Sequence, residues 1–266
     1  MQKQFLTYKT IQPIMEEKNF SKLSAMLNAD FNNEESIWLT KSKTLRKTIG
    51  YLGMALPFFL IISLYISTGF WGTLESISHY YYTRISGVFI GILSILAIFL
   101  IIYKGNEPKD LLVSVLAGIS ALFVVLFPTG NITDICHDAT KAYAVTILPN
   151  SAFRENFHYI SAAVFLGSLA YMSIFLFTKS NKIKTLRGTK KRFRNRIYRT
   201  CGIIMIIAML TILSSFIFEK LGMASIWTNF YDKYKLTFWM EALAIESFGF
   251  SWLIKGETLF KDEEQP

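Results

Sequence analysis

Six long stretches of mainly apolar residues recur along the chain, separated by shorter polar segments. A helix rises about 1.5 Å per residue, so roughly 20 residues cross the hydrocarbon layer of a bilayer. The stretches contain 17 to 23 residues, and the third and fifth are the shortest. The pattern predicts an all-α, polytopic membrane protein, a six-helix bundle with spans at residues 48–70, 83–103, 111–127, 157–178, 201–218 and 236–254.

The composition favours a membrane protein over a soluble one. Apolar residues make up 52% of the 266 residues, and charged residues make up only 18%. A soluble core could not bury six such stretches. The formal net charge of +9 also suits nucleic-acid binding. Because the basic residues border the apolar stretches, we expect lipid headgroups as their counter-charge and no nucleic acid.

The distribution of Lys and Arg predicts the orientation. Eighteen of these residues flank the spans on the side of the N-terminus, and six lie on the other side. Positive loops resist translocation, so we expect both termini in the cytoplasm and the protein in the cytoplasmic (inner) membrane. The predicted parts are a cytoplasmic segment, a transmembrane domain and a cytoplasmic tail, at residues 1–47, 48–254 and 255–266. The first segment lacks a signal peptide, and its sequence suits either a short amphipathic helix or a partly ordered tail.

Residues 179–199 carry ten positive charges and no acid. We interpret this segment as the inner anchor between the fourth and fifth spans, in contact with anionic lipids. A nucleic-acid-binding arm is the alternative, which the position between two spans makes remote.

Small residues recur at helical spacing in several spans. Gly87 and Gly91 form a GxxxG motif in the second span, and Gly118 has the same role in the third. Small residues allow helix backbones to approach closely in lipid, so we expect these glycines in seams within the bundle. A homo-oligomer contact through Gly87 and Gly91 is the alternative.

The two cysteines, Cys136 and Cys201, fall on opposite sides of the predicted bilayer, so no disulfide is expected. The chain also lacks CxxC and CxxCH, the usual zinc and haem signatures, and we expect no cofactor. Aromatic residues suit belts at the two membrane surfaces, with Tyr80 to Tyr82, Trp71, Trp227 and Trp239 on the outer side and Trp252 on the inner side.

Polar residues that could carry chemistry gather on the predicted outer side. The segment ESISHYYYTR before the second span contributes Ser76, Ser78, His79 and Arg84, and the fourth span begins with His158. All three histidines, including His137 of the long outer segment, are predicted to be extracytoplasmic. These residues are candidates for a ligand or proton site.

Two glutamates lie within the sixth span. Glu241 and Glu246 fall about 7 and 15 Å below its outer end. A carboxylate in hydrocarbon costs about 2.5 to 3.5 kcal/mol, so both should face the bundle interior. Glu246 shares a helix face with Ala242 and Gly249, which predicts a buried seam. The two alternatives are a proton, cation or substrate site and buried hydrogen bonds that hold the helix in place.

The histidines also raise the possibility of a membrane-embedded metal hydrolase that uses His79, His137 and His158. No HxxxH or HExxH motif supports such a metal site, and a bis-histidine haem is weaker still. For each histidine alone, hydrogen bonding beside tyrosines at the membrane surface is the commoner role.

Four segments carry a resemblance to known proteins: SISHYYYTRISGVFIGIL, FPTG, HYISAAVFLGSLAYMSIFLF and FWMEALAIESFGFSWLIKGE. Their order resembles uncharacterised bacterial six-span membrane proteins. It is more distantly similar to domain of unknown function 998 and the Frag/DRAM/Sfk-like membrane proteins. Those groups share a Ser-containing outer segment and a His at the start of the fourth span, which match Ser76, Ser78 and His158. The resemblance implies an integral membrane protein with no assured enzyme activity.

These observations predict a non-enzymatic membrane protein with an outer-facing polar pocket that binds a lipid or small ligand. The first alternative is a proton- or cation-coupled transporter that uses Glu241 and Glu246. The hydrolase is the second.

Overall fold

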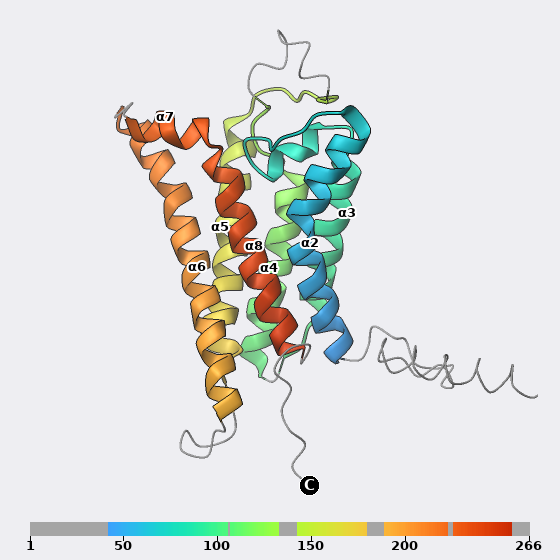
Figure 1. Cartoon of the computed structure of the whole chain (residues 1–266), viewed down its shortest axis with the longest axis vertical. Helices are drawn as coiled ribbons and strands as arrows, with labels where there is room; N and C mark the ends of the chain where they lie inside the picture. Colours follow the sequence, from blue (N-terminus) through green and yellow to red (C-terminus); the bar gives the residue numbers. More distant parts are fainter. Residues whose placement is uncertain (1–41, 106, 133–142, 180–188, 223–225, 257–266) are drawn as a thin grey trace, which may run out of the picture.

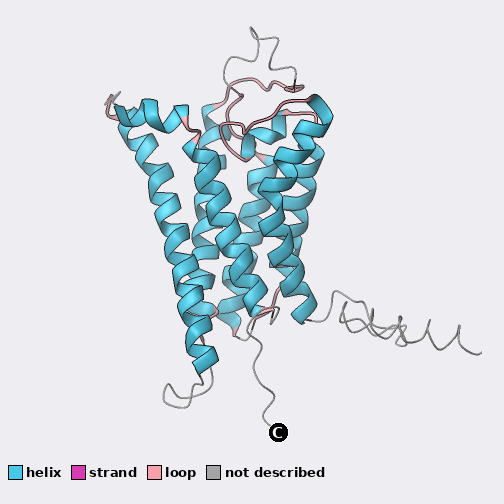
Figure 2. Cartoon of the chain, viewed as in Figure 1, coloured by secondary structure: helices cyan, strands magenta, loops and turns pink. Residues whose placement is uncertain are grey.

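The computed structural model describes residues 42–105, 107–132, 143–179, 189–222 and 226–256, and this part of the chain is all-helical (Figures 1 and 2). The predicted amphipathic helix of the first segment lies outside the described residues. The long helices are α2 (Ser42–Thr68), α3 (Ser86–Ile102), α4 (Pro108–Leu126), α5 (Ala152–Tyr171), α6 (Thr189–Lys220) and α8 (Leu236–Lys255). Shorter ones are η2 (Ser78–Tyr82), a π-helical turn η5 (Met172–Leu176) that continues α5, and α7 (Ile226–Lys233).

Four of the helices are long and apolar enough to cross a membrane: α2, α4, the continuous α5–η5 and α6. The helix α3 is equally apolar but has 17 residues. The helix α8 has 20 residues, and its two glutamates lower its hydropathy. The described chain is therefore a helical protein with membrane-spanning character, as the pattern of apolar stretches predicts.

Each long helix packs against the next one along the chain, and α8 packs against α6 and returns to α2. Figure 1 shows the consequence: the last helix lies beside the first. The segments 69–85, 127–132 and 143–151 and the helix α7 lie at one end of the bundle, which we call the loop end. The starts of α2, α4 and α6 and the end of α8 lie at the opposite end, which we call the basic end.

Glycines set the closest approaches between helices. A Cβ atom at Gly249 of α8 would lie 2.8 Å from the carbonyl oxygen of Gly50 in α2. A Cβ at Gly118 of α4 would lie 2.6 Å from the carbonyl oxygen of Ala97 in α3. Real Cβ contacts are not this short, so the absence of a side chain lets these backbones touch. The prediction that Gly118 lies in a seam is confirmed.

The prediction for Gly87 and Gly91 is wrong. A Cβ at either position would meet no atom within 4 Å, so neither glycine lies in a seam within the described chain. The belt prediction is wrong for Trp252, Tyr80 and Tyr82, whereas Trp71 and Trp239 of the predicted outer belt are exposed. Trp252, Tyr80 and Tyr82 are completely buried, because their rings pack among other aromatic side chains and helix ends instead of facing a membrane surface.

The helix starts differ most from the predicted ranges at the first, fourth and fifth spans, and α2 begins at Ser42, six residues before the first predicted span. The fifth span was expected to start at residue 201, but α6 begins at Thr189. Eleven residues of the basic segment, 189–199, are therefore part of a long helix. Hydropathy could not predict this part of the helix, because it identifies only the apolar residues of a membrane helix and these residues are mostly charged. The helix α5 begins at Ala152, five residues before the predicted span, where Ser151 caps it by accepting a hydrogen bond from the Arg154 backbone N–H.

Candidate functional site

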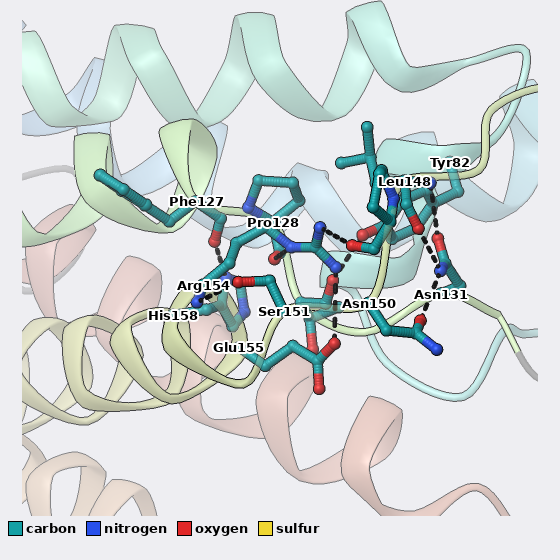
Figure 3. A network of polar contacts seen from close by, with 12 residues as sticks. Tyr82, Phe127, Pro128, Asn131, Leu148, Asn150, Ser151, Arg154, Glu155 and His158 are labelled. Carbon is teal, nitrogen blue, oxygen red and sulfur yellow. Dashed lines mark hydrogen bonds and ion pairs between the residues drawn. The ribbon is translucent and has the colours of Figure 1, made fainter.

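Three consecutive backbone carbonyls follow α4, and each accepts a hydrogen bond from a side chain of another segment (Figure 3). The Phe127 oxygen lies 2.8 Å from His158 Nδ1, and the Pro128 oxygen lies 3.1 Å from Arg154 Nε. The Thr129 oxygen accepts from the Tyr82 hydroxyl. Carbonyls at a helix C-terminus have no partner within the helix, so these donors satisfy them and fix where the chain goes next.

Arg154 and Asn131 hold the loop end together (Figure 3). Besides Pro128, the Arg154 guanidinium donates to the Pro149 carbonyl at 2.6 Å and contacts Glu155 at 3.4 Å. The Asn131 amide pairs with both backbone groups of Leu148, at 2.8 and 3.0 Å. The connection between α4 and α5 is therefore anchored at both of its described ends.

Tyr82 donates its hydrogen bond to the Thr129 carbonyl as a neutral phenol. Burial raises the pKa of Tyr82 to about 12, so its hydroxyl keeps its proton at any physiological pH. The hydrogen bond to Thr129 joins the loop before α3 to the loop after α4.

His158 links the carbonyls that follow α4 to the segment before α3. Its Nδ1 faces the Phe127 carbonyl, which can only accept, so Nδ1 carries the proton. In the neutral ring, Nε2 then accepts from the Ser78 hydroxyl at 3.1 Å. Both side chains are buried, with 3% of His158 and 7% of Ser78 exposed. The two hydrogen bonds, from Ser78 to His158 and from His158 to the Phe127 carbonyl, hold the imidazole in one tautomer and one orientation.

A second serine–histidine pair lies one turn away. The Ser76 hydroxyl is 2.7 Å from His79 Nδ1, and it also accepts from the His79 backbone N–H at 3.2 Å. His79 Nε2 lies 3.5 Å from a carboxylate oxygen of Glu75, whose side chain is 43% exposed. Burial lowers the pKa of His79, and the nearby Glu75 carboxylate opposes this shift. The ring is therefore neutral at pH 7, and its Nδ1 accepts a hydrogen bond from the Ser76 hydroxyl.

Glu241 brings α8 to the same place. Its carboxylate accepts a 2.7 Å hydrogen bond from the backbone N–H of Ile77, between the two serines. The backbone N–H of Phe238 donates to the Glu75 carbonyl at 3.1 Å, and Lys235 donates to the carbonyl of Thr73. The start of α8 is thus attached to the segment 73–77 at three points.

Five of the seven predicted site residues therefore meet at the loop end. They are Ser76, Ser78, His79, His158 and Glu241. Together with Glu75 we call them the Ser/His/Glu cluster. Helical spacing could not predict this arrangement, because segment 75–79 reaches His158 and Glu241 over 80 and 164 residues of chain.

Arg84 and Glu246 lie outside the cluster. The Arg84 side chain is exposed, and its backbone N–H pairs with the Tyr143 carbonyl at 3.2 Å. Glu246 was expected in a buried seam with Ala242 and Gly249. Those two are buried, but Glu246 is partly exposed and forms no hydrogen bond or ion pair with the other described residues. The face toward α2 is narrow, because Gly249 touches the α2 backbone directly, and the glutamate falls beside it.

The sequence did not single out Arg154, Tyr82 or the Phe127 carbonyl as site residues. The only sequence signal was the FPTG motif, in which a proline follows a helix end. A carbonyl has no residue type, so it cannot be recognised from sequence.

Among the described residues, no group of three or more His, Cys, Asp or Glu side chains is placed to hold a metal ion. His137 lies outside the described part, so a three-histidine metal site stays a prediction.

The comparisons with known proteins add no relative. No family model matched the chain, and neither a curated protein sequence nor a solved structure matched it. The resemblance to domain of unknown function 998 therefore stays a prediction.

Proposed function

We propose that the chain crosses the cytoplasmic membrane six times, with both termini in the cytoplasm and the loop end outside. The four apolar helices support this arrangement, because α3 and α8 pack between them and run alongside them through the bundle (Figure 1). The excess of Lys and Arg at the basic end agrees with the positive-inside rule. In this arrangement the Ser/His/Glu cluster lies at the outer surface.

The proposed function is non-enzymatic binding of a small polar ligand or a lipid headgroup at the Ser/His/Glu cluster. The observation that carries the proposal is the convergence of two Ser–His pairs and a membrane-helix glutamate from three distant segments. Polar and titratable groups at membrane depth are costly, and they mark functional sites more often than surface groups do.

The chemistry of the cluster indicates the kind of ligand. The carboxylates of Glu75 and Glu241 accept hydrogen bonds, and the serine hydroxyls keep free lone pairs after donating to the neutral histidines. A group that offers hydroxyl or ammonium donors complements this set. Headgroups that carry ethanolamine or glycerol have such donors, and so do small polyols and amines.

Native mass spectrometry of the gently extracted protein tests the proposal. We expect the wild type to retain a small molecule or lipid, and Ser78→Ala to lose it. Ser161→Ala is the matched control, because Ser161 is an equally buried serine whose hydroxyl only returns to the Phe157 carbonyl of its own helix. If both variants retain the same ligand as the wild type, the cluster is not its site.

One observation favours a second candidate, an acyl hydrolase without metal. A serine hydroxyl donates to a histidine that a third group orients, which is the arrangement of an activated nucleophile. A fluorophosphonate probe should then label Ser78 in the wild type and not in His158→Asn. Absence of labelling on the folded wild type removes this candidate. The transporter that uses both Glu241 and Glu246 stays a prediction, since the two carboxylates have different surroundings.

A further inference from the structure

The short helix α7 lies across the loop end, between the end of α6 and the start of α8 (Figure 1). Two residues with left-handed backbone set this direction. Gly222 after α6 has a φ of 65°, and Lys235 before α8 has a φ of 51°. A residue in this conformation ends a right-handed helix. The chain therefore turns away from the axis of α6, runs along the end of the bundle and turns again into α8.

One side of α7 packs against the bundle. Tyr231 is only 3% exposed, and its hydroxyl oxygen lies 3.0 Å from Oγ1 of Thr237 in α8. Just after α7, the Lys235 ammonium donates to the Thr73 carbonyl and lies 5.9 Å from the centre of the Phe70 ring. These contacts fix how α7 is rotated about its own axis, so its other sides cannot turn inward.

A second side of α7 is apolar and exposed. Ile226 and Phe230, four residues apart, are 89% and 46% exposed. Tyr234 continues the last turn, since its backbone N–H donates to the Phe230 carbonyl at 3.1 Å, and its side chain is exposed as well. Residues four apart lie on the same side of a helix. The three side chains therefore form one exposed row, which we call the apolar row.

A third side of α7 is polar. Asn229, Asp232 and Lys233 are exposed. Asp232 and Lys233 come three and four residues after Asn229, so the three share one side of the helix. The Lys233 ammonium lies 5.6 Å from the centre of the Tyr234 ring, where the polar side meets the apolar row. A lysine can cover apolar surface with its stem in this way while its charge stays in water.

The three sides together indicate the surroundings of α7. A helix on the surface of a soluble protein has a buried side and a polar side, whereas a membrane-spanning helix has a buried side and an apolar, lipid-facing side. The helix α7 has all three, which suits the place where bundle, lipid and water meet. Helices that lie in the plane of a membrane surface combine large apolar side chains on one side with polar ones on the other.

The apolar row also lies between lipid-facing surfaces along the chain. Ile217 near the end of α6 and Trp239 in the first turn of α8 are both about half-exposed. The helix α6 is one of those apolar enough to cross a membrane, and exposed apolar side chains of such a helix contact lipid. The helix α7 therefore begins and ends beside side chains that suit lipid.

We infer that α7 docks on the outer leaflet of the membrane as an interfacial helix, with the apolar row in the lipid and the polar side toward the water. Ile226 and Phe230 then contact the upper parts of the acyl chains, and the Tyr234 ring lies at the headgroups. Because α8 begins at Leu236, docking of α7 also fixes the depth at which α8 carries Glu241 into the Ser/His/Glu cluster. The inference rests on the proposed membrane arrangement but is independent of the ligand of the cluster.

Fluorescence quenching of labelled single cysteines tests this contact. In a full-length chain without Cys136 and Cys201, Phe230→Cys and the matched control Asp232→Cys each carry a bimane label, and the protein is reconstituted in phosphatidylcholine vesicles. Two quenchers are compared, a phosphatidylcholine with brominated acyl chains and iodide on both sides of the bilayer. We expect the brominated lipid to quench the label at Phe230→Cys roughly twofold or more above that at Asp232→Cys, and iodide to reverse the order.

Any other pattern overturns the inference. Equal quenching by iodide at both positions would place the apolar row in water. Protection of the Phe230→Cys label from both quenchers would show that protein covers the row, and a disulfide between two unlabelled Phe230→Cys chains would identify a second copy as the cover. A labelled Leu213→Cys on the exposed surface of α6 separates the two proposals. If the brominated lipid quenches Leu213→Cys but not Phe230→Cys, the docking of α7 alone is wrong. If it quenches neither, the membrane arrangement is wrong and the docking falls with it.

A second measurement needs no label. Thermal unfolding of Ile226→Ser and of the matched control Asn229→Ser is compared with the wild type in phosphatidylcholine nanodiscs. Ile226 has little contact with its own chain, so a loss of stability there reports contact with lipid. We expect Ile226→Ser to unfold roughly 2 to 4 °C below the wild type and Asn229→Ser to unfold near it. If the two variants unfold at the same temperature, the apolar row gains nothing from lipid and the inference is wrong.

Discussion

The contact between α2 and α8 gives a sharp prediction, because a single methyl group at Gly249 has no room. A Cβ there would lie 2.7 Å from Met54 Cγ and 2.8 Å from both the Met54 nitrogen and the Gly50 oxygen. The side-chain atom could move, but the two backbone atoms could not. Gly249→Ala must therefore push α8 away from α2. Gly91→Ala is the matched control, since the same methyl group would meet nothing within 4 Å.

The magnitudes follow from two opposing effects. Overpacking of a tight contact costs about 1 to 3 kcal/mol. Replacement of a helical glycine by alanine stabilises by roughly 0.5 to 1 kcal/mol, because the unfolded chain loses freedom. We expect Gly249→Ala to lower the free energy of unfolding by about 1 to 2 kcal/mol. Gly91→Ala should leave it unchanged or raise it by up to about 1 kcal/mol.

Unfolding in mixed micelles, followed by circular dichroism, measures both variants under the same conditions. The account requires the two substitutions to differ in sign or by more than about 1 kcal/mol. If Gly249→Ala is as stable as Gly91→Ala, the backbones of α2 and α8 do not touch. A large loss at Gly91 instead would restore the predicted seam, within one chain or between two copies.

Three further predictions concern the two ends of the bundle. Arg154→Met removes donors to two loop carbonyls and should cost about 2 kcal/mol in unfolding free energy, whereas the exposed Arg84→Met should cost less than about 0.5 kcal/mol. Burial lowers the pKa of His79, so below about pH 6.5 the imidazole binds a proton more readily in the unfolded chain than in the folded protein. Thermal stability should therefore fall as the pH drops below about 6.5. His79→Gln should show a shallower fall. Lys179→Met removes the ammonium that binds Glu107 and Asp110 and should lower the unfolding temperature more in low salt than in high salt.

Each of these predictions has an outcome that contradicts it. Equal costs for Arg154→Met and Arg84→Met would mean that the loop carbonyls do not depend on the guanidinium. A wild type and His79→Gln with the same stability profile between about pH 7.5 and 5.5 would show that this ring does not resist protonation. A salt-independent effect of Lys179→Met would exclude an ion pair as its cause.

The helices were predictable from sequence because their signal is local. A run of apolar residues such as 83–103 or 236–254 needs only its own length to indicate a helix. The start of α6 was missed for the same reason, since the charged residues 190–199 continue the helix but do not look apolar.

The candidate site was predictable in its residue types but not in its geometry. Ser78 and His158 stood out because they are polar residues beside apolar spans. Their pairing depends on the Phe127 carbonyl, which fixes the histidine tautomer and has no signature in the sequence. Glu246 shows the reverse error: helical spacing placed it on the buried face of Gly249, but in the structure its side chain is partly exposed.

The central claim is that the helical bundle presents the Ser/His/Glu cluster at the outer surface of the cytoplasmic membrane. Labelling of single cysteines in intact bacterial cells with a membrane-impermeant maleimide tests it most directly. In a background without Cys136 and Cys201, Glu75→Cys marks the cluster, and the exposed Lys104→Cys marks the opposite end. The account predicts that Glu75→Cys is labelled in intact cells and Lys104→Cys only after permeabilisation. The reverse order, or equal labelling of both in intact cells, would contradict it.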